Sequence, residues 1–306
     1  MGAAMGKRAV KAPKNSILTL GNFDGVHLGH LKILSRVASR ARSLGRPSVV
    51  YTFEPHPLKV IAPERSPMLL MDSKDKREFL KKIGIDAVIS TRFTKAFAAR
   101  RPDEFVEREL VGKLHVREVW VGHDFCFGKG RTGTPAYLKG LGRRFGFKVV
   151  VEKAYKKSGA IVSSSRIRSL VLGGKVHAAA TLLGRNYSIK GVVVKGSSIG
   201  MGIGYPTANL KVKSEIIPKD GVYAAHALIR GILYDALVNI GVAPTFGAKA
   251  RTVEAHILGF NGKIYGRDME VFFVKRIRDE RKFADIAALK SRIRKDVLTA
   301  KAIFKR

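Results

Sequence analysis

Apolar positions in the first half of the chain switch repeatedly between the spacing of a buried strand and that of an amphipathic helix. Short apolar runs of strand length occur at 17–20, 49–53, 87–90, 119–122 and 148–151. Segments with apolar residues at helical spacing lie between them, at 29–44, 74–83 and 102–113. Strands separated by helices form parallel sheets, so residues 1–183 are predicted to be a doubly wound α/β domain.

The pattern changes after about Arg185, where strand-like segments follow one another with turns and little helix between them. These segments are 188–195, 222–229, 233–239, 252–258 and 269–274. A last amphipathic helix is predicted from about Ala284, because Ile286, Leu289, Ile293 and Val297 recur at helical spacing. Residues 184–306 are therefore predicted to form a small antiparallel β-barrel domain with a C-terminal helix.

Length and charge add a second kind of information. A chain of 306 residues fits two domains. Lys and Arg number 58 against 24 Asp and Glu, a formal net charge of +34. Such an excess attracts nucleic acid, anionic membrane or phosphorylated small molecules. We interpret it first as the sign of a generally basic proteome or of a solvated helix face, and expect at most weak, non-specific and salt-sensitive binding of nucleic acid, because no sequence-reading motif is present.

Location is expected from what the sequence contains. No apolar run is long enough to span a bilayer, and no apolar signal core follows the basic N-terminus. The single cysteine, Cys126, excludes a disulfide within the chain, which fits a reducing compartment. We therefore expect a cytoplasmic protein without a membrane partner.

The first chemical constellation is the segment 21–30, which reads Gly-Asn-Phe-Asp-Gly-Val-His-Leu-Gly-His between a strand and a helix. Gly21 and Gly25 permit a tight turn close to a ligand. His27 and His30 lie where a helix N-terminus offers free N–H groups to phosphate. Both rings can donate hydrogen bonds to oxygens that gain charge in a transition state. Zinc is the alternative for paired histidines, but no further ligand has suitable spacing nearby.

Three further segments accompany it: Tyr-Thr-Phe-Glu-Pro-His-Pro at 51–57, Val-Gly-His-Asp-Phe-Cys-Phe-Gly at 121–128, and Ser-Ser-Ser-Arg-Ile-Arg at 163–168. With the His-x-Gly-His segment they resemble the flavin-specific branch of the nucleotidylyltransferases, the bacterial FAD synthetase family. In place of the family's usual threonine the chain has Ser165, which keeps the hydroxyl.

This resemblance implies roles for individual residues. Those expected at the ATP phosphates, in addition to the catalytic His27 and His30, are Gly21, Phe23, Asp24, Ser164, Ser165 and Arg166. Those expected at the flavin are Phe53, Pro55, Asp124, Phe125 and Phe127. The phenylalanines suit stacking on an isoalloxazine ring, although ordinary core packing is the alternative interpretation, equally weighted for Phe53.

The second constellation is a glycine-bearing loop, including Gly196, followed by Pro206-Thr207-Ala208-Asn209. In an extended segment Thr207 and Asn209 point the same way, which suits a hard cation and phosphate oxygens. The segment resembles the Pro-Thr-Ala-Asn motif of riboflavin kinases. That resemblance implies that Thr207 and Asn209 bind Mg²⁺ and ATP. The segment Val-Glu-Ala-His at 253–256 resembles the part of the kinase that carries its catalytic glutamate, which implies that Glu254 is the base, with a solvent-facing strand residue as the alternative interpretation. His226 and His256 are interpreted as ordinary strand residues.

Together the motifs resemble the bifunctional riboflavin kinase/FMN adenylyltransferase family over about residues 16–296. The family's chemistry is phosphorylation of riboflavin by ATP to give FMN, then adenylyl transfer from ATP to FMN to give FAD and pyrophosphate. One alternative is adenylyl transfer alone, because Met201 stands where the family often has an arginine. Another is a basic nucleic-acid-binding protein on the same scaffold. The barrel motif argues against other adenylyltransferases and tRNA synthetases.

Overall fold

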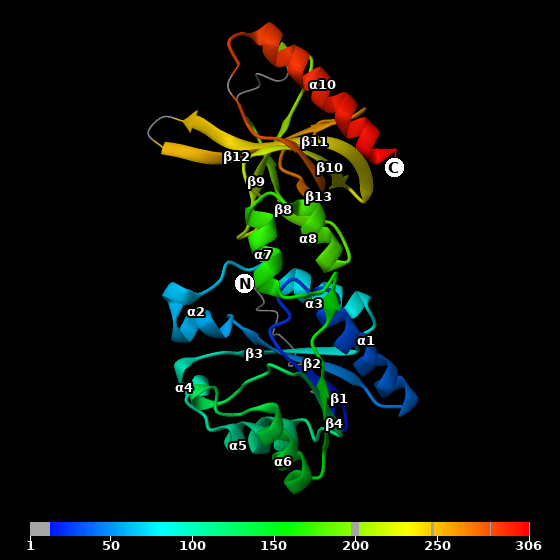
Figure 1. Cartoon of the computed structure of the whole chain (residues 1–306), viewed down its shortest axis with the longest axis vertical. Coiled ribbons are helices and arrows are strands. Elements are labelled where there is room, and N and C mark those ends of the chain that lie inside the picture. Colours follow the sequence, from blue (N-terminus) through cyan, green and yellow to red (C-terminus); the bar gives the residue numbers. More distant parts are fainter. Residues whose placement is uncertain (1–12, 197–201, 246–247, 282, 306) are drawn as a thin grey trace, which may run out of the picture. The chain divides into compact units, whose positions relative to one another are not determined.

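The chain divides into two compact units, each with its own sheet (Figure 1). The computed structural model describes residues 13–196, 202–245, 248–281 and 283–305. The first unit runs to Pro67 and continues over Asp72–Ile161. The second contains Met68–Met71 and the chain from Val162 onward. The short segment 68–71 is attached to the second unit by Arg168, whose Nε donates to the Met68 carbonyl at 2.7 Å, and by Glu215, which accepts from the Leu69 N–H at 2.8 Å.

The first unit is built on a five-stranded parallel sheet, as the alternating pattern predicted. Its strand order is β3-β2-β1-β4-β5. The strands are β1 (Ile17–Leu20), β2 (Ser48–Glu54), β3 (Ala87–Arg92), β4 (Glu118–Gly122) and β5 (Lys148–Glu152). Strand order reverses direction between β1 and β4, and ligands of such sheets bind beyond the carboxyl ends of the strands at that point.

Helices cover both faces of this sheet (Figure 1). Those of the unit are α1 (Leu28–Ser43), α2 (Pro57–Ile61), η1 (Pro63–Arg65), α3 (Ser73–Lys82), α4 (Lys95–Ala98), α5 (Pro102–Phe105), η2 (Val106–Lys113), η3 (Lys129–Arg131) and α6 (Pro135–Phe145). α1 and α3 lie on one face, and α5 with α6 on the other. A short hairpin of β6 (Lys156–Lys157) and β7 (Ala160–Ile161) completes the unit.

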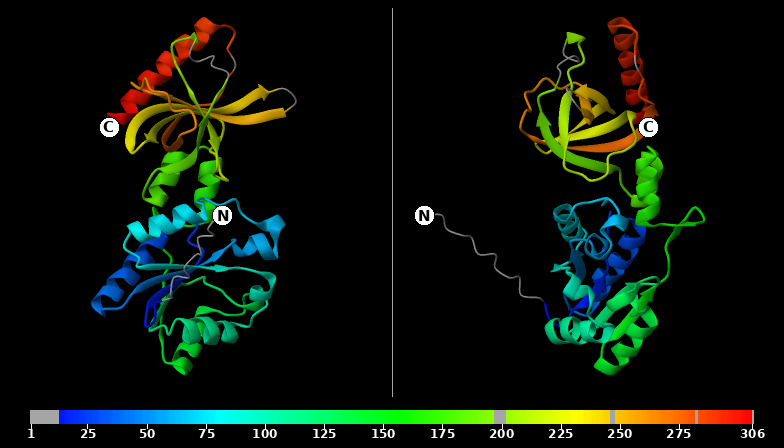
Figure 2. Two further views of the ribbon diagram at one scale, coloured as in Figure 1. Left: turned by 180° about the vertical axis from the view of Figure 1, so that it is seen from behind. Right: turned by 90° about the vertical axis from the view of Figure 1, so that its left-hand side faces the viewer.

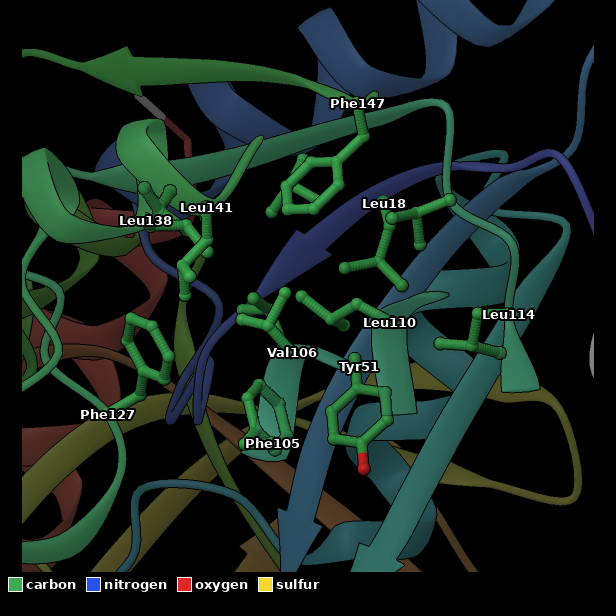
Figure 3. Close-up of a cluster of buried hydrophobic side chains, with 14 of the residues drawn as sticks. Leu18, Tyr51, Phe105, Val106, Leu110, Leu114, Phe127, Leu138, Leu141 and Phe147 are labelled. Carbon is green, nitrogen blue, oxygen red and sulfur yellow. The ribbon is translucent and has the colours of Figure 1, made fainter. Parts of the chain in front are cut away.

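A large apolar cluster joins the sheet to α5, η2 and α6 (Figure 3). Leu18 and Tyr51 enter it from the strands, and Val106, Leu110 and Leu138 from the helices. All five are at most 1% exposed. Burying a side chain of this size contributes about 1.5–3 kcal/mol. Because side chains alternate along a strand, the neighbours of these strand residues point to the opposite face, toward α1 and α3.

The second unit contains a closed antiparallel barrel, which confirms the predicted fold class (Figure 2). Its order is β10-β11-β12-β9-β8-β13. The strands are β8 (Tyr187–Val194), β9 (Ala208–Val212), β10 (Gly221–Ile229), β11 (Ile232–Thr245), β12 (Ala248–Ile257) and β13 (Asp268–Arg278). Buried and less buried residues alternate along β8, as expected where one face of a strand fills a barrel.

Of the residues that the structure describes, those accompanying the barrel as helices are α7 (Ser164–Leu172), α8 (Val176–Leu183) and α10 (Ile286–Phe304). α10 packs on Val222, Ala224 and Leu237 of the barrel through its apolar face. Its buried Asp296 accepts from Arg278 Nε at 2.8 Å. By packing, α7 and α8 belong to the second unit, whereas the sequence prediction assigned them to residues 1–183. The predicted boundary between the two activities, after Leu183, is not tested by packing and stays a prediction.

Two candidate active sites

The segment between β1 and α1 lies at the sheet's switch point and adopts an unusual backbone. Phe23 and Val26 have positive φ angles of 50° and 38°, and Gly25 has φ 74°. Left-handed conformations of non-glycine residues cost about 1–3 kcal/mol each and persist only where the surroundings impose them. A β-branched residue such as Val26 is especially disfavoured there. Strain at the end of a central strand is typical of a functional loop.

The two histidines of this loop lie against each other. His27 caps α1, and its Nδ1 accepts a hydrogen bond from the His30 N–H at 3.2 Å. The two rings stack with centroids 3.6 Å apart and planes inclined by 15°. Because Nδ1 of His27 is an acceptor, the neutral ring carries its proton on Nε2. The structure thus brings together the two residues that the sequence analysis proposed as catalytic.

The local environment keeps His30 uncharged. Burial, together with the charges of His27 and Lys76, lowers the pKa of His30 well below its ordinary value. The Phe23 ring meets it edge-on, with centroids 5.2 Å apart. Among the described residues, the buried Nδ1 of His30 has no hydrogen-bond partner. A neutral imidazole can still donate from one nitrogen, which is the chemistry required at a developing phosphate charge.

Close packing explains two glycines of the motif. A Cβ on Gly21 would lie 3.1 Å from the Phe23 ring, and one on Gly29 would lie 3.1 Å from Cε1 of His27. Both positions therefore bring backbone against an aromatic ring of the loop. Asp24, expected near the ATP phosphates, is 7% exposed. The sequence motif thus encodes a tightly packed turn as well as its histidines.

The residues expected at the flavin lie at the end of β2 and beyond the ends of β2 and β4. Phe53 is partly buried, and its ring meets Phe93 and Phe97 at centroid distances of 5.5 and 5.8 Å. These two partners were not singled out from the sequence, because they lie outside the motif segments and single phenylalanines carry no motif. Pro55, which follows a cis peptide bond, is exposed.

The candidates after β4 have unequal environments. Asp124 is exposed and Phe125 partly exposed, whereas Phe127 is 7% exposed and belongs to the apolar core of the unit. The rings of Phe125 and Phe127 stack with centroids 5.5 Å apart. For Phe127 the structure therefore favours the core interpretation, with Phe125 between it and the surface. Contact of either ring with flavin stays a prediction.

The serine–arginine segment forms the start of α7 in the second unit. Ser163 caps this helix by accepting from the Arg166 N–H at 3.3 Å. Ser165 and Arg166 are exposed, and Ser164 is partly buried. A capped helix start with an exposed guanidinium is suited to phosphate. The expected role of Ser164, Ser165 and Arg166 toward the ATP of the first site stays a prediction.

The candidate kinase site is a row of polar side chains across three barrel strands. In the ladder, Glu254 of β12 is directly opposite Asn209 of β9 on one side and Asn239 of β11 on the other. Their neighbours Ala208, Val253 and Ile240 are buried in the barrel, so the three polar residues lie on its outer face. Asn239 was not among the residues predicted from the sequence, because its place beside Glu254 depends on strand register.

Glu254 has a second carboxylate near it. Burial, and secondarily the charge of Glu280, raises the pKa of Glu254. Glu280 follows β13, and its carboxylate occupies the space that a Cβ on Gly241 would need. Gly241 pairs with Thr252, two residues before Glu254 on the same face of β12. A carboxylate with a raised pKa is a stronger base once it is ionised, as removing a proton from a hydroxyl requires.

Replacing Glu280 by glutamine is expected to move the acidic limb of the pH profile for riboflavin phosphorylation to lower pH. The negative charge of Glu280 raises the pKa of Glu254, so its removal lowers that pKa and leaves Glu254 ionised under more acidic conditions. The measurement is kcat/KM for riboflavin against pH. Asp268→Asn, at a side chain 84% exposed, is the matched control. An unmoved limb in Glu280→Gln would contradict the assignment.

The other predicted residues of the second constellation lie close to this row. Burial alternates along 207–210, with Ala208 and Leu210 buried and Thr207 and Asn209 less so. A Cβ on Gly196 would lie 1.9 Å from the Asn209 side-chain amide, so glycine allows that approach. His256, interpreted earlier as an ordinary strand residue, lies 2.9 Å from the Pro206 carbonyl through Nδ1. It therefore holds the segment that carries Thr207. Met201 lies outside the described residues.

The chemistry of the outer-face residues fits a hard cation. Thr207, Asn209 and Glu254 offer hydroxyl, amide and carboxylate oxygens, which Mg²⁺ prefers. Within the described ranges no group of three or more His, Cys, Asp or Glu side chains is arranged to hold a metal by itself. Mg²⁺ commonly takes one or two protein oxygens and completes its shell with water and substrate phosphates. These residues therefore suit a Mg²⁺ ion that is bound mainly by the phosphates of a nucleotide.

Comparison with known proteins matches the two halves of the chain to two families. The FAD synthetase family model matches residues 9–166, and the riboflavin kinase model matches residues 183–304. The chain is 38% identical over 288 residues to the bifunctional riboflavin kinase/FMN adenylyltransferase of Haemophilus influenzae, covering 94% of each chain. It is 36% identical to the enzyme of that name from Escherichia coli strain K12, covering 96% of this chain and 95% of that one.

A solved structure shares the whole fold. A crystal structure described as a macrolide-efflux protein from Streptococcus pneumoniae superposes with a TM-score of 0.87 at 30% identity, over 95% of both chains. Its description concerns that protein, and the superposition shows that the two chains share a fold. In the part of this chain that the structure describes, no helix has the length and apolar character needed to cross a membrane.

The chain therefore belongs to a class of proteins that join an FAD synthetase domain to a riboflavin kinase domain. It belongs to the bifunctional riboflavin kinase/FMN adenylyltransferase family.

Proposed function

We propose that this protein phosphorylates riboflavin to FMN and then adenylylates FMN to FAD, using ATP in both steps. The observation that supports this most is that each unit contains its own polar site. The first has the stacked His27–His30 pair at the switch point of a parallel sheet. The second has Glu254 between Asn209 and Asn239 on the barrel. Both family matches agree with this division.

In the adenylyl step, an oxygen of the FMN phosphate attacks the α-phosphorus of ATP and pyrophosphate leaves. No side-chain nucleophile is required, so the protein's contribution is positioning and stabilisation of charge. His27 and His30 donate hydrogen bonds to the phosphate oxygens from the N-terminus of α1. Gly21, Phe23 and Asp24 shape the loop around them, and Asp124, Pro55 and the partly exposed Phe53 and Phe125 line the flavin side.

In the kinase step, Glu254 takes the proton of riboflavin's terminal hydroxyl. The resulting oxygen attacks the γ-phosphorus of ATP, and ADP leaves. Asn209 and Thr207 hold the nucleotide phosphates together with Mg²⁺, which supplies charge neutralisation when bound. Gly196 lies against the Asn209 side chain, where it leaves room for that amide. His256 keeps the Thr207 segment in place through Pro206.

One chromatographic assay tests the proposal. The purified protein is incubated with riboflavin, ATP and Mg²⁺, and flavins and nucleotides are separated over time. The expected result is FMN followed by FAD, with ADP and pyrophosphate as the other products. FAD from added FMN, without any product from riboflavin, would reduce the function to adenylyl transfer. No flavin product from either substrate would refute the proposal.

The setting of the enzyme is also part of the proposal. Its partners are the small molecules riboflavin, FMN and ATP, and its location is the cytoplasm. Functional domains are proposed at 1–183 for adenylyl transfer and 184–306 for the kinase. The net charge of +34 motivates weak, non-specific binding of nucleic acid, which disappears as salt rises.

A further inference from the structure

A buried lysine lies beside the first site and has no role in the chemistry described so far. Lys76 is on α3, and it shares the buried face of that helix with Leu80. Its side chain is 9% exposed, where an apolar residue is usual for an amphipathic helix. Lysine is almost never buried to this extent unless its ammonium group is paired. The position therefore calls for an explanation beyond packing.

The ammonium group of Lys76 connects α3 to the loop that carries the histidines. Nζ donates to the backbone carbonyl of Asn22 at 2.9 Å and to Oγ1 of Thr52 at 3.2 Å. Asn22 directly precedes Phe23, the first residue of the loop with a positive φ angle. Thr52 is fully buried on β2, and its contact with Lys76 directs its hydroxyl toward α3. Lys76 thus joins a helix, a strand and the strained loop at one point.

Charges on several elements act on this group. Burial lowers the pKa of Lys76, while Asp24 of the loop and Glu54 of β2 oppose that shift and Arg77 adds to it. Lys76 and His27 in turn act on His30 from α3 and from the start of α1. The charges of Lys76, His27 and His30 therefore influence one another, and the negative charge of the buried Asp24 favours the charged form of Lys76.

We propose that Lys76 is a positioning residue of the adenylyl-transfer site, which binds the Asn22 carbonyl and so holds the loop that carries His27 and His30. This inference rests on the proposed function, because it assigns a role within that site. The hydrogen bond from the Lys76 ammonium group fixes the Asn22 carbonyl, and this restrains the backbone from leaving the left-handed conformation that begins at Phe23. The positive charge of Lys76 also makes a second positive charge on His30 unfavourable.

The test compares Lys76→Met with two other variants in the full-length protein. Lys76→Met keeps the length of the side chain and removes the cation. Lys76→Arg keeps the cation. Lys81→Met removes an exposed lysine from the same helix and controls for net charge. For each, kcat/KM for ATP in FMN adenylylation is measured against pH, and riboflavin phosphorylation is measured on the same sample.

Lys76→Met is expected to lower kcat/KM for ATP by about 10²-fold, the size of effect that a misplaced catalytic group produces. Its acidic limb is expected at higher pH than in the wild type, because the pKa of His30 rises when the neighbouring cation is removed. Lys76→Arg should keep the limb at the wild-type pH even where its rate is lower. Riboflavin phosphorylation should remain at the wild-type rate in all three variants.

The outcomes separate this inference from the proposed function. If Lys76→Met matches Lys81→Met in both rate and pH profile, the role of Lys76 is refuted while adenylyl transfer stands. If Lys76→Met lowers the rate without moving the limb, the effect of the Lys76 charge on His30 is refuted. If Lys76→Met loses both activities because it fails to fold, the test rests on Lys76→Arg. A shift of the acidic limb of its pH profile away from the wild-type position would then overturn the proposal. A wild-type protein that makes no FAD refutes the function itself.

Discussion

Replacing His30 by alanine is expected to lower the rate of FMN adenylylation by about 10²–10³-fold while riboflavin phosphorylation continues at the wild-type rate. The size corresponds to the loss of one donor to a developing phosphate charge in a water-excluded site. The ring also stacks on His27, so its removal leaves that partner less well held. FAD and FMN formed from riboflavin and ATP are measured by chromatography, with FMN expected to accumulate.

A matched control for this variant is His177→Ala, which removes an exposed histidine of α8 in the second unit. It should leave both rates unchanged. If His30→Ala stopped both steps in a protein that melts like the wild type, the assignment of one activity to each unit would be wrong. If it changed neither step, the stacked histidine pair would have no catalytic role.

Replacing Glu254 by glutamine is expected to reduce riboflavin phosphorylation by about 10²–10⁴-fold, the contribution of a positioned general base. Added FMN should still be converted to FAD at the wild-type rate, because that step uses the other unit. Both conversions are measured in parallel from riboflavin and from FMN.

Loss of folding is not expected to explain this result. The pKa of Glu254 is raised by burial and by Glu280, so its ionised form is disfavoured in the folded protein. A neutral glutamine of the same shape removes that disfavoured charge, and the free energy of unfolding near neutral pH should not fall. Comparison with Glu280→Gln tests the roles directly, since that variant should move the pH profile without a comparable loss of rate. Phosphorylation at the wild-type rate in Glu254→Gln would exclude it as the base.

Elements with regular apolar spacing were predicted well from the sequence. The helix expected over 29–44 is α1, Leu28–Ser43, and the strand expected over 17–20 is β1, Ile17–Leu20. The helix expected over 102–113 exists as two consecutive pieces, α5 and η2. These predictions succeeded because periodicity reports which face of a local segment is buried, and that depends on neighbours only a few positions away.

Elements with contradictory local signals were missed. α6 contains Gly140 and Gly142, which lower helix propensity. The structure explains the second of them, because a Cβ on Gly142 would lie 2.7 Å from the Phe147 carbonyl oxygen. Close approach of the chain to the helix requires glycine there, and tertiary contact outweighs local preference. β9 (Ala208–Val212) was missed as well: its five residues do alternate between apolar and polar, but so short a run directly after a glycine-bearing loop was not separated from that loop.

By itself the sequence determined the fold class, the two motif-bearing loops and the residue types available for phosphate and proton chemistry. Only the tertiary structure decided which of those residues lie together. In the structure His27 stacks on His30, and Asn209, Glu254 and Asn239 lie side by side on three strands. Phe127 lies in the core, and Lys76 contacts the loop of the first site. The reason is physical: spacing along the chain controls local conformation, whereas strand register, burial and the charges facing a side chain depend on segments distant in sequence.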